Sequence, residues 1–212
     1  MRAQDDLVRS GKILYLGISN APAWIVAQAQ CLADRYGWAP LISLQVEYNL
    51  VNRTAEFDLV PMAHAMGLGI SPWSPTAGGL LTGKYGRADM ARAPLAAGVA
   101  PTRADFVQSL LNERSLRIAE TVAAIADEKG CRPAQLALRW LLDQPGVCSP
   151  IIGCRSEAQL LENICCLDLA LSEEQRSRLD AVSRPEAIVP YNVIEGDIIM
   201  GQISGGTNIE RR

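Results

Sequence analysis

Short apolar segments alternate with helical patterns along this chain. We predict strands over 13–19, 41–46, 68–72 and 147–152, since each is a run of mostly apolar residues bounded by Gly, Pro, Asn or Ser. The runs are continuous and do not alternate with polar residues, which favours a parallel sheet buried on both faces. This order of strands and helices predicts an α/β fold.

Glycines and capping residues mark the expected helices. Thr54 is a candidate N-cap, Gly130 is a stop signal, and Ser172 with Gln175 forms a capping box. After the end of a helix at 5–10, the helices that this pattern predicts cover 23–36, 55–66, 113–129, 134–143, 156–165 and 173–183.

Two segments lack a periodic pattern. The stretch 73–104 is rich in Gly, Ala and Pro, and connections of that length in compact domains are usually binding loops or lids. Residues 184–212 indicate an irregular C-terminal tail. A length of 212 residues suits one domain over 1–212 with a sizeable core.

Composition argues against several classes of partner. The net charge is −3 and no basic cluster occurs, so nucleic acid and anionic membrane surfaces are not expected partners. No apolar run approaches the ~18 residues of a membrane span, and the first residues do not resemble a signal peptide. We therefore expect a cytoplasmic protein.

The six cysteines suggest neither disulfides nor a metal site. Cys165 and Cys166 are adjacent, Cys31 and Cys148 lie in apolar patterns, and no Cys-x-x-Cys occurs. We expect buried, reduced thiols. The single histidine, His64, has no ligand-spaced partners, so we expect no metal and place His64 on a helix surface.

Polar residues occur at the strand ends, where a parallel sheet binds ligands. Ser19 and Asn20 end the first strand, Gln45 lies in the second, and Trp73 follows the third. Ser19 and Asn20 fit a helix cap equally well, and Trp73 fits either plain packing or a stacking surface for a planar ring. A buried Gln45 amide would need a partner, from the protein or from a ligand amide.

A glycine-rich segment nearly matches a phosphate-binding P-loop. Gly78-Gly-Leu-Leu-Thr-Gly-Lys84 has the right spacing, but Tyr85 replaces the hydroxyl residue that binds Mg²⁺. The following residues, 86–101, are poor in helix signals, whereas a P-loop opens a helix directly. We therefore do not expect an ATP-type loop, although the glycines and Lys84 suit a close approach to phosphates.

The last strand leads into a helix with an arginine at its start. Gly153 and Arg155 precede the helix at 156–165. Such a terminus is either an anion site or a capped helix with solvated polar residues, and the local pattern alone favours the capped helix.

Taken in order, these segments resemble the aldo-keto reductase superfamily, the NADP-dependent (β/α)₈ barrels of the TIM type. Gly205-Gly-Thr near the end also resembles the family's C-terminus. Each motif is weak alone, but the ordered set is specific and covers essentially the whole chain. The matching segments are Gly17-Ile-Ser-Asn20, Leu44-Gln-Val-Glu-Tyr-Asn49, Pro72-Trp-Ser-Pro75, Gly79-Leu-Leu-Thr-Gly-Lys-Tyr85 and Pro150-Ile-Ile-Gly-Cys-Arg-Ser156, with Gln159, Glu162 and Asn163.

The resemblance implies a site for NADP(H). By this resemblance Ser19, Asn20 and Gln45 hold the nicotinamide carboxamide, and Trp73 stacks on the nicotinamide ring. The remaining implied contacts are Ser74, Pro75, Gly78 and Lys84 along the pyrophosphate, and Gly153, Arg155, Gln159, Glu162 and Asn163 at the adenosine end, with Arg155 near the 2′-phosphate.

The resemblance also implies that about half a barrel is present. The chain matches strands five to eight with their helices, and no residue matches the family's catalytic Asp, Tyr, Lys and His. Hydride transfer to a carbonyl needs a proton donor beside the carbonyl oxygen. We therefore expect the chain alone to be inactive or very weak.

Two interpretations stay open. The chain is the cofactor half of an NADP-dependent carbonyl reductase, which acts on a small carbonyl substrate once the missing half is supplied, or it is a non-enzymatic NADP(H)-binding module. For the module, exposed sheet edges at 13–18 and 147–152 favour self-association through a two-fold axis.

Overall fold

The computed structural model describes residues 1–91 and 102–194. A parallel sheet has the order β1 (Leu16–Ser19), β2 (Leu41–Glu47), β3 (Gly69–Trp73). Its α-helices are α1 (Arg2–Arg9), α2 (Ala23–Tyr36), α3 (Leu59–Ala65), α4 (Arg103–Leu110), α5 (Glu113–Lys129), α6 (Pro133–Leu142), α7 (Glu157–Ile164), α8 (Glu173–Ser183) and α9 (Tyr191–Ile194). The α/β class that the sequence predicts is confirmed.

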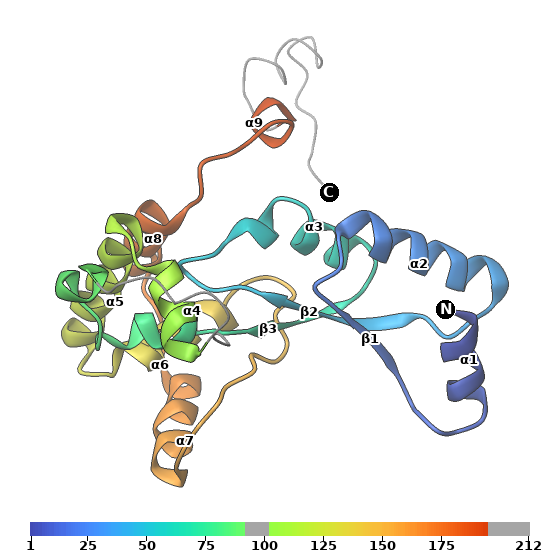
Figure 1. Cartoon of the computed structure of the whole chain (residues 1–212), viewed down its shortest axis with the longest axis horizontal. Coiled ribbons are helices and arrows are strands. Elements are labelled where there is room, and N and C mark those ends of the chain that lie inside the picture. Colours follow the sequence, from blue (N-terminus) through green and yellow to red (C-terminus); the bar gives the residue numbers. More distant parts are fainter. Residues whose placement is uncertain (92–101, 195–212) are drawn as a thin grey trace.

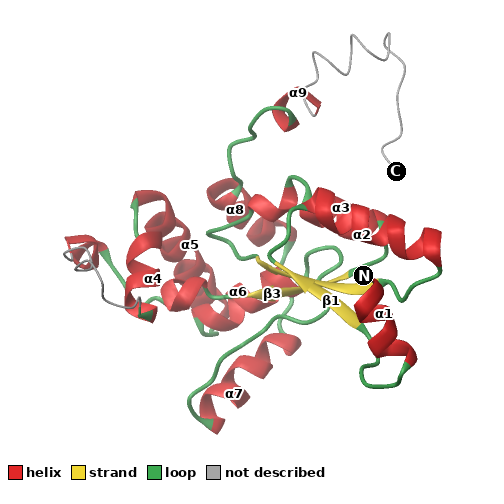
Figure 2. Ribbon diagram, turned by 45° about the vertical axis from the view of Figure 1, so that its right-hand side comes forward, coloured by secondary structure: helices red, strands yellow, loops and turns green. Residues whose placement is uncertain are grey.

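Helices occupy one side and one end of the sheet. Figure 1 shows α2 and α3 running along one side of it, with α4, α5, α6 and α8 gathered at the end where β3 finishes. Figure 2 shows the strands side by side and α7 extending downward from this helical group. Of the helices in the described part of the chain, none is long and apolar enough to cross a membrane.

The core joins the sheet to this helical group. Leu44 and Ile70 come from the sheet and are almost fully buried. They belong to one cluster with Leu80 and Leu81 from the turn after β3, and with Ile118, Ile125, Leu136, Trp140 and Leu141 from α5 and α6. The turn after β3 is thus anchored by buried leucines, which fixes the backbone at the carboxyl edge of the sheet.

The two faces of the sheet differ, contrary to the expectation of burial on both. The register aligns Leu44 with Ile70 and Val46 with Pro72, and these four side chains are buried. The opposite face carries small and polar residues that are exposed or half-buried, in the rows Gly17–Ser43–Gly69, Ser19–Gln45–Ser71 and Glu47–Trp73. We call this second face the open face.

The predicted strand at 147–152 is wrong. Val147 forms only an isolated bridge with Ile70, through the Ile70 amide to the Gly146 carbonyl (2.8 Å) and the Cys148 amide to the Ile70 carbonyl (2.9 Å). The next two ladder bonds would need N–H groups on Pro72 and Pro150, which proline lacks. The Ile151 amide bonds to the Pro72 carbonyl instead, at 2.8 Å.

Most predicted helices are confirmed, and the exceptions have local causes. Thr54 begins a short 3₁₀ turn (Thr54–Glu56), and α3 starts only at Leu59. A continuous helix over 55–66 would place Pro61 in its interior, whereas in α3 Pro61 lies in the first turn, where no N–H is needed. We did not predict α4, although Thr102 and Asp105 form a capping box at its start.

The two aperiodic segments contain more structure than predicted. Within 73–104 lie 3₁₀ turns at Ala77–Thr82 and Arg87–Ala91. The predicted irregular tail contains α9, and its remaining part from residue 195, including Gly205-Gly-Thr, lies outside the described residues. The segment 92–101 lies outside them as well.

Candidate functional site

Ser19 and Gln45 meet on the open face of the sheet. The Ser19 hydroxyl donates to Gln45 Oε1 at 3.3 Å, and both side chains are exposed. The expectation of a buried Gln45 is therefore wrong, because the open face has no covering layer in the described part of the chain. Gln45 Nε2 has no hydrogen-bond partner among the described residues, so this amide is available to a ligand carbonyl.

Asn20 fixes the orientation of Trp73. The indole Nε1 of Trp73 donates to Asn20 Oδ1 at 3.0 Å. The backbone amide of Asn20 donates to the backbone carbonyl of Gln45 at 3.1 Å. Asn20 has φ of 52°, a left-handed conformation that asparagine adopts more readily than other non-glycine residues. The ring of Trp73 also approaches Phe106, with centroids 6.4 Å apart. The indole is therefore held in place before any ligand arrives.

A tight turn carries the chain away from Trp73. Ser74 and Ala77 have φ of 53° and 51°, and Gly78 has φ of 65°. The Gly78 amide donates to Ser74 Oγ at 2.9 Å, and Asn49 Nδ2 donates to the Ser74 carbonyl at 3.0 Å. Non-glycine residues with positive φ, such as Ser74 and Ala77, are concentrated at functional sites. Asn49, fully buried, is a positioning residue that the sequence pattern did not single out.

Two adjoining cavities follow this turn, each of about 470 Å³. The ring cavity is lined by Trp73, Ser74, Pro75, Thr76, Gly78, Phe106, Leu138, Ile151, Ile152, Gly153 and Asn163. The basic cavity is lined by Thr76, Gly79, Thr82, Lys84, Arg132, Pro133, Ala134, Gly153, Arg155, Gln159, Glu162 and Asn163. They share Thr76, Gly153 and Asn163, so together they form one groove.

The groove contains most of the predicted site residues. It brings together Trp73, Ser74, Pro75, Gly78, Lys84, Gly153, Arg155, Gln159, Glu162 and Asn163. Ser19 and Gln45 line neither cavity and lie beside it, one row away from Trp73 on the open face. Asn20 contacts the groove only through Trp73.

The far end of the groove is positively charged. Lys84, Arg132 and Arg155 line it together with a single carboxylate, Glu162, which accepts from Arg132 Nε at 2.8 Å. The Arg155 backbone amide donates to Gln159 Oε1 at 2.9 Å, so Gln159 holds the backbone while the exposed guanidinium stays available. Arg132 was not predicted, because it lies at the start of α6, far from the segments that carried the pattern.

A third cavity, of about 660 Å³, is also lined by Trp73. We call it the acidic cavity, because Glu47, Asp58 and Glu186 line it. Its remaining walls are Asn20, Ala21, Pro22, Val46, Asn52, Thr54, Ala55, Phe57, Leu59, Trp73, Pro185, Ile188 and Tyr191. Tyr191 of α9 stacks on Phe57 with ring centroids 5.3 Å apart. The sequence pattern did not predict this cavity.

Comparison with known proteins gives the family. A model of the aldo/keto reductase family matches residues 1–184. The chain belongs to the aldo/keto reductase family.

Several curated relatives carry oxidoreductase names. An uncharacterized oxidoreductase of Bacillus subtilis, YrpG, is 36% identical over 79% of this chain and 48% of its own length. Versiconal hemiacetal acetate reductase of Aspergillus parasiticus is 33% identical over 90% of this chain and 54% of its own. An aryl-alcohol dehydrogenase [NADP(+)] of Phanerodontia chrysosporium is 30% identical over 91% of this chain and 48% of its own length. The chain thus spans about half the length of the curated relatives it matches.

Within this chain, Tyr48 is a structural residue. Its side chain is 1% exposed, and its hydroxyl donates to Glu56 Oε1 at 2.6 Å. Burial, followed by the hydrogen bond to Glu56, raises the pKa of Tyr48 far above its usual value. A phenol held in this way cannot deliver a proton to a ligand in the groove.

The thiols of this aldo/keto reductase are free but mostly not buried, contrary to the prediction. Of the six cysteines only Cys166 is buried, and Cys31, Cys148 and Cys165 are exposed. Cys148 is exposed because its sulfur lies against Gly69 on the open face. His64 is exposed on α3, as predicted.

The P-loop alternative does not fit the backbone. The segment from Ala77 forms 3₁₀ turns that end at Gly83, in a left-handed conformation. In the described part of the chain the next α-helix after Lys84 is α4, so the lysine does not stand at a helix N-terminus. The glycine backbone and Lys84 of this segment line the basic cavity without forming a P-loop.

Proposed function

We propose that this chain is the NADP(H)-binding half of an aldo-keto reductase barrel of the TIM type. In this proposal Ser19, Asn20 and Gln45 hold the nicotinamide carboxamide, and Trp73 covers the ring. The pyrophosphate lies along Ser74, Pro75, Gly78 and Lys84, and the adenosine end contacts Gly153, Arg155, Gln159, Glu162 and Asn163.

The observation that carries this proposal is the polarity of the groove. Its first part is walled by an indole and by the apolar side chains of Phe106, Leu138 and Ile151, which suit a planar ring. Its second part has an excess of positive charge from Lys84, Arg132 and Arg155, which suits phosphates. A dinucleotide has this same sequence of parts, and the printed name of the Phanerodontia relative includes NADP(+).

Bound NADPH supplies a hydride to a carbonyl carbon, and the carbonyl oxygen then needs a proton. The described residues of this chain bind and orient: Gln45 offers an amide without a partner, and Trp73 presents a ring fixed by Asn20. Tyr48 is committed to Glu56 in the core. We therefore propose that the proton donor is contributed by the barrel half that this chain does not match.

NADPH titration of the full chain tests the proposal. We expect NADPH to quench tryptophan fluorescence with saturation, since Trp73 lies against the proposed ring site. Trp73→Phe should remove most of the quenching. The matched control is Trp24→Phe, because Trp24 is 66% exposed on α2, away from the groove. Saturable quenching that survives Trp73→Phe, or no saturation at all, would contradict the assignment.

A second candidate is a binding module that self-associates without catalysis. Leu14 and Tyr15, directly before β1, are 76% and 72% exposed, and β1 has a free edge in the described sheet. Exposed apolar residues beside a free edge favour pairing with another chain. Sedimentation equilibrium distinguishes the candidates: a dimer dispersed by Tyr15→Lys supports the module. Restoration of carbonyl reduction by a separately produced complementary half supports the enzyme.

The proposed location remains the cytoplasm. All six cysteines are free thiols, and a reducing compartment keeps them so.

A further inference from the structure

We propose that the acidic cavity binds an organic cation with an aromatic or apolar body. The cavity is formed at the carboxyl end of β2 by the segment leading into α3 and by the segment that joins α8 to α9. Its volume of about 660 Å³ lies in the range of small-molecule sites. The inference deepens the proposed function by naming a substrate class, and in that respect it rests on the proposed function.

Charge is the first argument. Glu47, Asp58 and Glu186 line the cavity, and none of the described residues that line it is Lys, Arg or His. No ion pair joins these three carboxylates to a described residue. The nearby Arg53 is committed elsewhere, to Glu56 at 2.7 Å and to Asp180 at 2.6 Å. The cavity therefore presents uncompensated negative charge, which attracts a cation.

Glu47 supplies the sharpest feature. Its Oε2 accepts from Asn52 Nδ2 at 3.1 Å, whereas its Oε1 is shielded from solvent and has no hydrogen-bond partner. Because no described group donates to this oxygen, the negative charge of Glu47 is only partly compensated, and a cation in the cavity that Glu47 lines would stabilise it through space. Glu47 is paired in register with Trp73, so this oxygen lies in the row of the open face that carries the indole.

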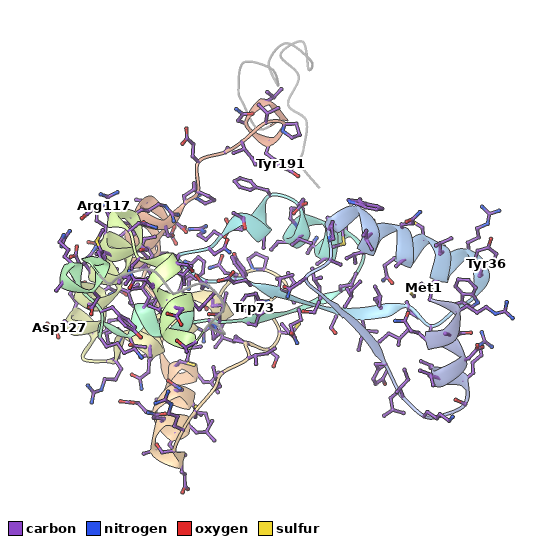
Figure 3. The ribbon with its side chains drawn as sticks, viewed as in Figure 1. Met1, Tyr36, Trp73, Arg117, Asp127 and Tyr191 are labelled. Atoms are coloured by element: carbon purple, nitrogen blue, oxygen red, sulfur yellow. The ribbon has the colours of Figure 1, made fainter. Side chains whose placement is uncertain are left out.

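The aromatic residues that line the cavity favour a ligand with an aromatic or apolar body. Phe57 and Tyr191 stack with an interplanar angle of 18°, and Trp73 also lines the cavity. Figure 3 shows Tyr191 on α9 and Trp73 at the sheet, on different segments of the chain. Aromatic faces combined with carboxylates recognise ammonium groups, whose charge is stabilised by both.

The three carboxylates are spread around the walls. Within the part of the chain that the structure describes, no group of three or more Asp, Glu, His or Cys side chains is placed to hold a metal ion. Asp58 comes from the segment leading into α3, and Glu186 comes from the segment that joins α8 to α9. This distribution suits a larger ion with diffuse charge, such as an alkylammonium group.

The position of the cavity gives the cation a role. Trp73 and Asn20 line the acidic cavity, and Trp73 also lines the ring cavity, so the two cavities share Trp73 as a lining residue. A carbonyl compound that bears an ammonium group can thus anchor its charge at Glu47 while it reaches the nicotinamide end. The inferred substrate class is therefore amine-bearing aldehydes or ketones.

Binding of simple probes without NADPH tests the cavity itself. Isothermal titration of the full chain should show that benzyltrimethylammonium binds at least about tenfold more tightly than benzyl alcohol, with no binding of benzoate. Equal affinity for the three probes would overturn the inference. So would Mg²⁺ displacing the ammonium probe at equal concentration.

Variants locate the site and keep it separate from the proposed function. Glu47→Gln keeps the acceptor for Asn52 and should weaken the ammonium probe about tenfold, while the matched control Asp34→Asn, exposed on α2, should have no effect. Phe57→Leu gives a second test should Glu47→Gln fail to fold. Arg155→Ala should leave the ammonium probe unaffected. Absence of NADPH binding with intact cation binding would contradict only the proposed function. Absence of cation binding with intact NADPH binding would contradict only this inference.

Discussion

The two sides of Trp73 have opposite charge. On one side the groove ends at Lys84, Arg132 and Arg155, and on the other the acidic cavity carries Glu47 and its two companion carboxylates. One indole, held by Asn20, belongs to both. The comparison teaches how charge would sort the two proposed ligands: an anionic dinucleotide is favoured in the groove, and a cationic compound is favoured in the acidic cavity.

The two sides are also built differently. The groove is made from the turn after β3 and the start of α7, which local glycine and capping signals define. The acidic cavity depends on distant segments that Arg53 joins: its Nη1 donates to Asp180 and to Ser183 Oγ, at 2.6 Å and 2.7 Å. Those two residues lie at the end of α8, directly before Pro185 and the cavity wall.

Removing Arg53 should disrupt the segments that form the acidic cavity and give the largest loss of free energy among these predictions. Arg53 is 5% exposed and lies over Trp140 at 5.0 Å. Burial lowers the pKa of Arg53, but Glu56 and Asp180 outweigh burial and hold it above its usual value. Arg53→Met leaves both carboxylates without their partner, so the free energy of unfolding should fall by about 3–5 kcal/mol. Urea denaturation measures it.

The control for Arg53 is an exposed ion pair. Arg178 bonds to Glu128 at 2.8 Å with both side chains more than a third exposed, so Arg178→Met should cost less than about 1 kcal/mol. Similar midpoints for the two variants would show that the Arg53 network does not hold these segments together.

Removing Arg155 should weaken the basic side selectively. The Arg155 guanidinium is exposed and free to reach a phosphate. Arg155→Ala should weaken NADPH binding about 10–100-fold and NADH binding much less, because only NADPH carries the 2′-phosphate. Fluorescence titration measures both constants. Arg117→Ala, an exposed arginine of α5 labelled in Figure 3, is the matched control. An equal loss for both cofactors would refute the 2′-phosphate role.

A methyl group at Gly78 should disturb the turn after β3, with a smaller effect than the loss of Arg53 or Arg155. A Cβ there would lie 2.7 Å from Val107 Cγ2, and φ is 65°. Gly78→Ala should cost about 1–2 kcal/mol in unfolding free energy and weaken NADPH. Gly86→Ala is the control, since a Cβ there meets nothing within 4 Å and φ is not positive. A fully stable Gly78→Ala chain would show that the turn adapts.

Local signals allowed most helices to be predicted, and long-range pairing explains the errors. Gly37 and Gly130 end α2 and α5 in left-handed conformations, and Ser172 caps α8, each readable from a few neighbouring residues. The predicted strand at 147–152 does not form because Pro72 and Pro150, which lack N–H groups, meet where the ladder would continue. A sequence shows both prolines but not that they face each other.

The groove could be predicted for a similar reason, and the acidic cavity could not. The groove residues follow strands or start helices, and the family resemblance orders them. The acidic cavity needs Tyr191 to stack on Phe57 across more than a hundred residues, and no pattern near either residue indicates it. The exposure of Gln45 was missed because apolar runs suggested two covered faces, whereas burial alternates along β3 and from Leu44 onward in β2.

Hydrogen exchange of the full chain with each ligand tests the central comparison most directly. NADPH should slow amide exchange over 73–84 and 153–163, and benzyltrimethylammonium should slow it over 52–59 and 185–191. Neither ligand should change exchange over 30–40. If both ligands protect the same segments, or if NADPH leaves 73–84 and 153–163 unchanged, the account of two oppositely charged sites sharing Trp73 is contradicted.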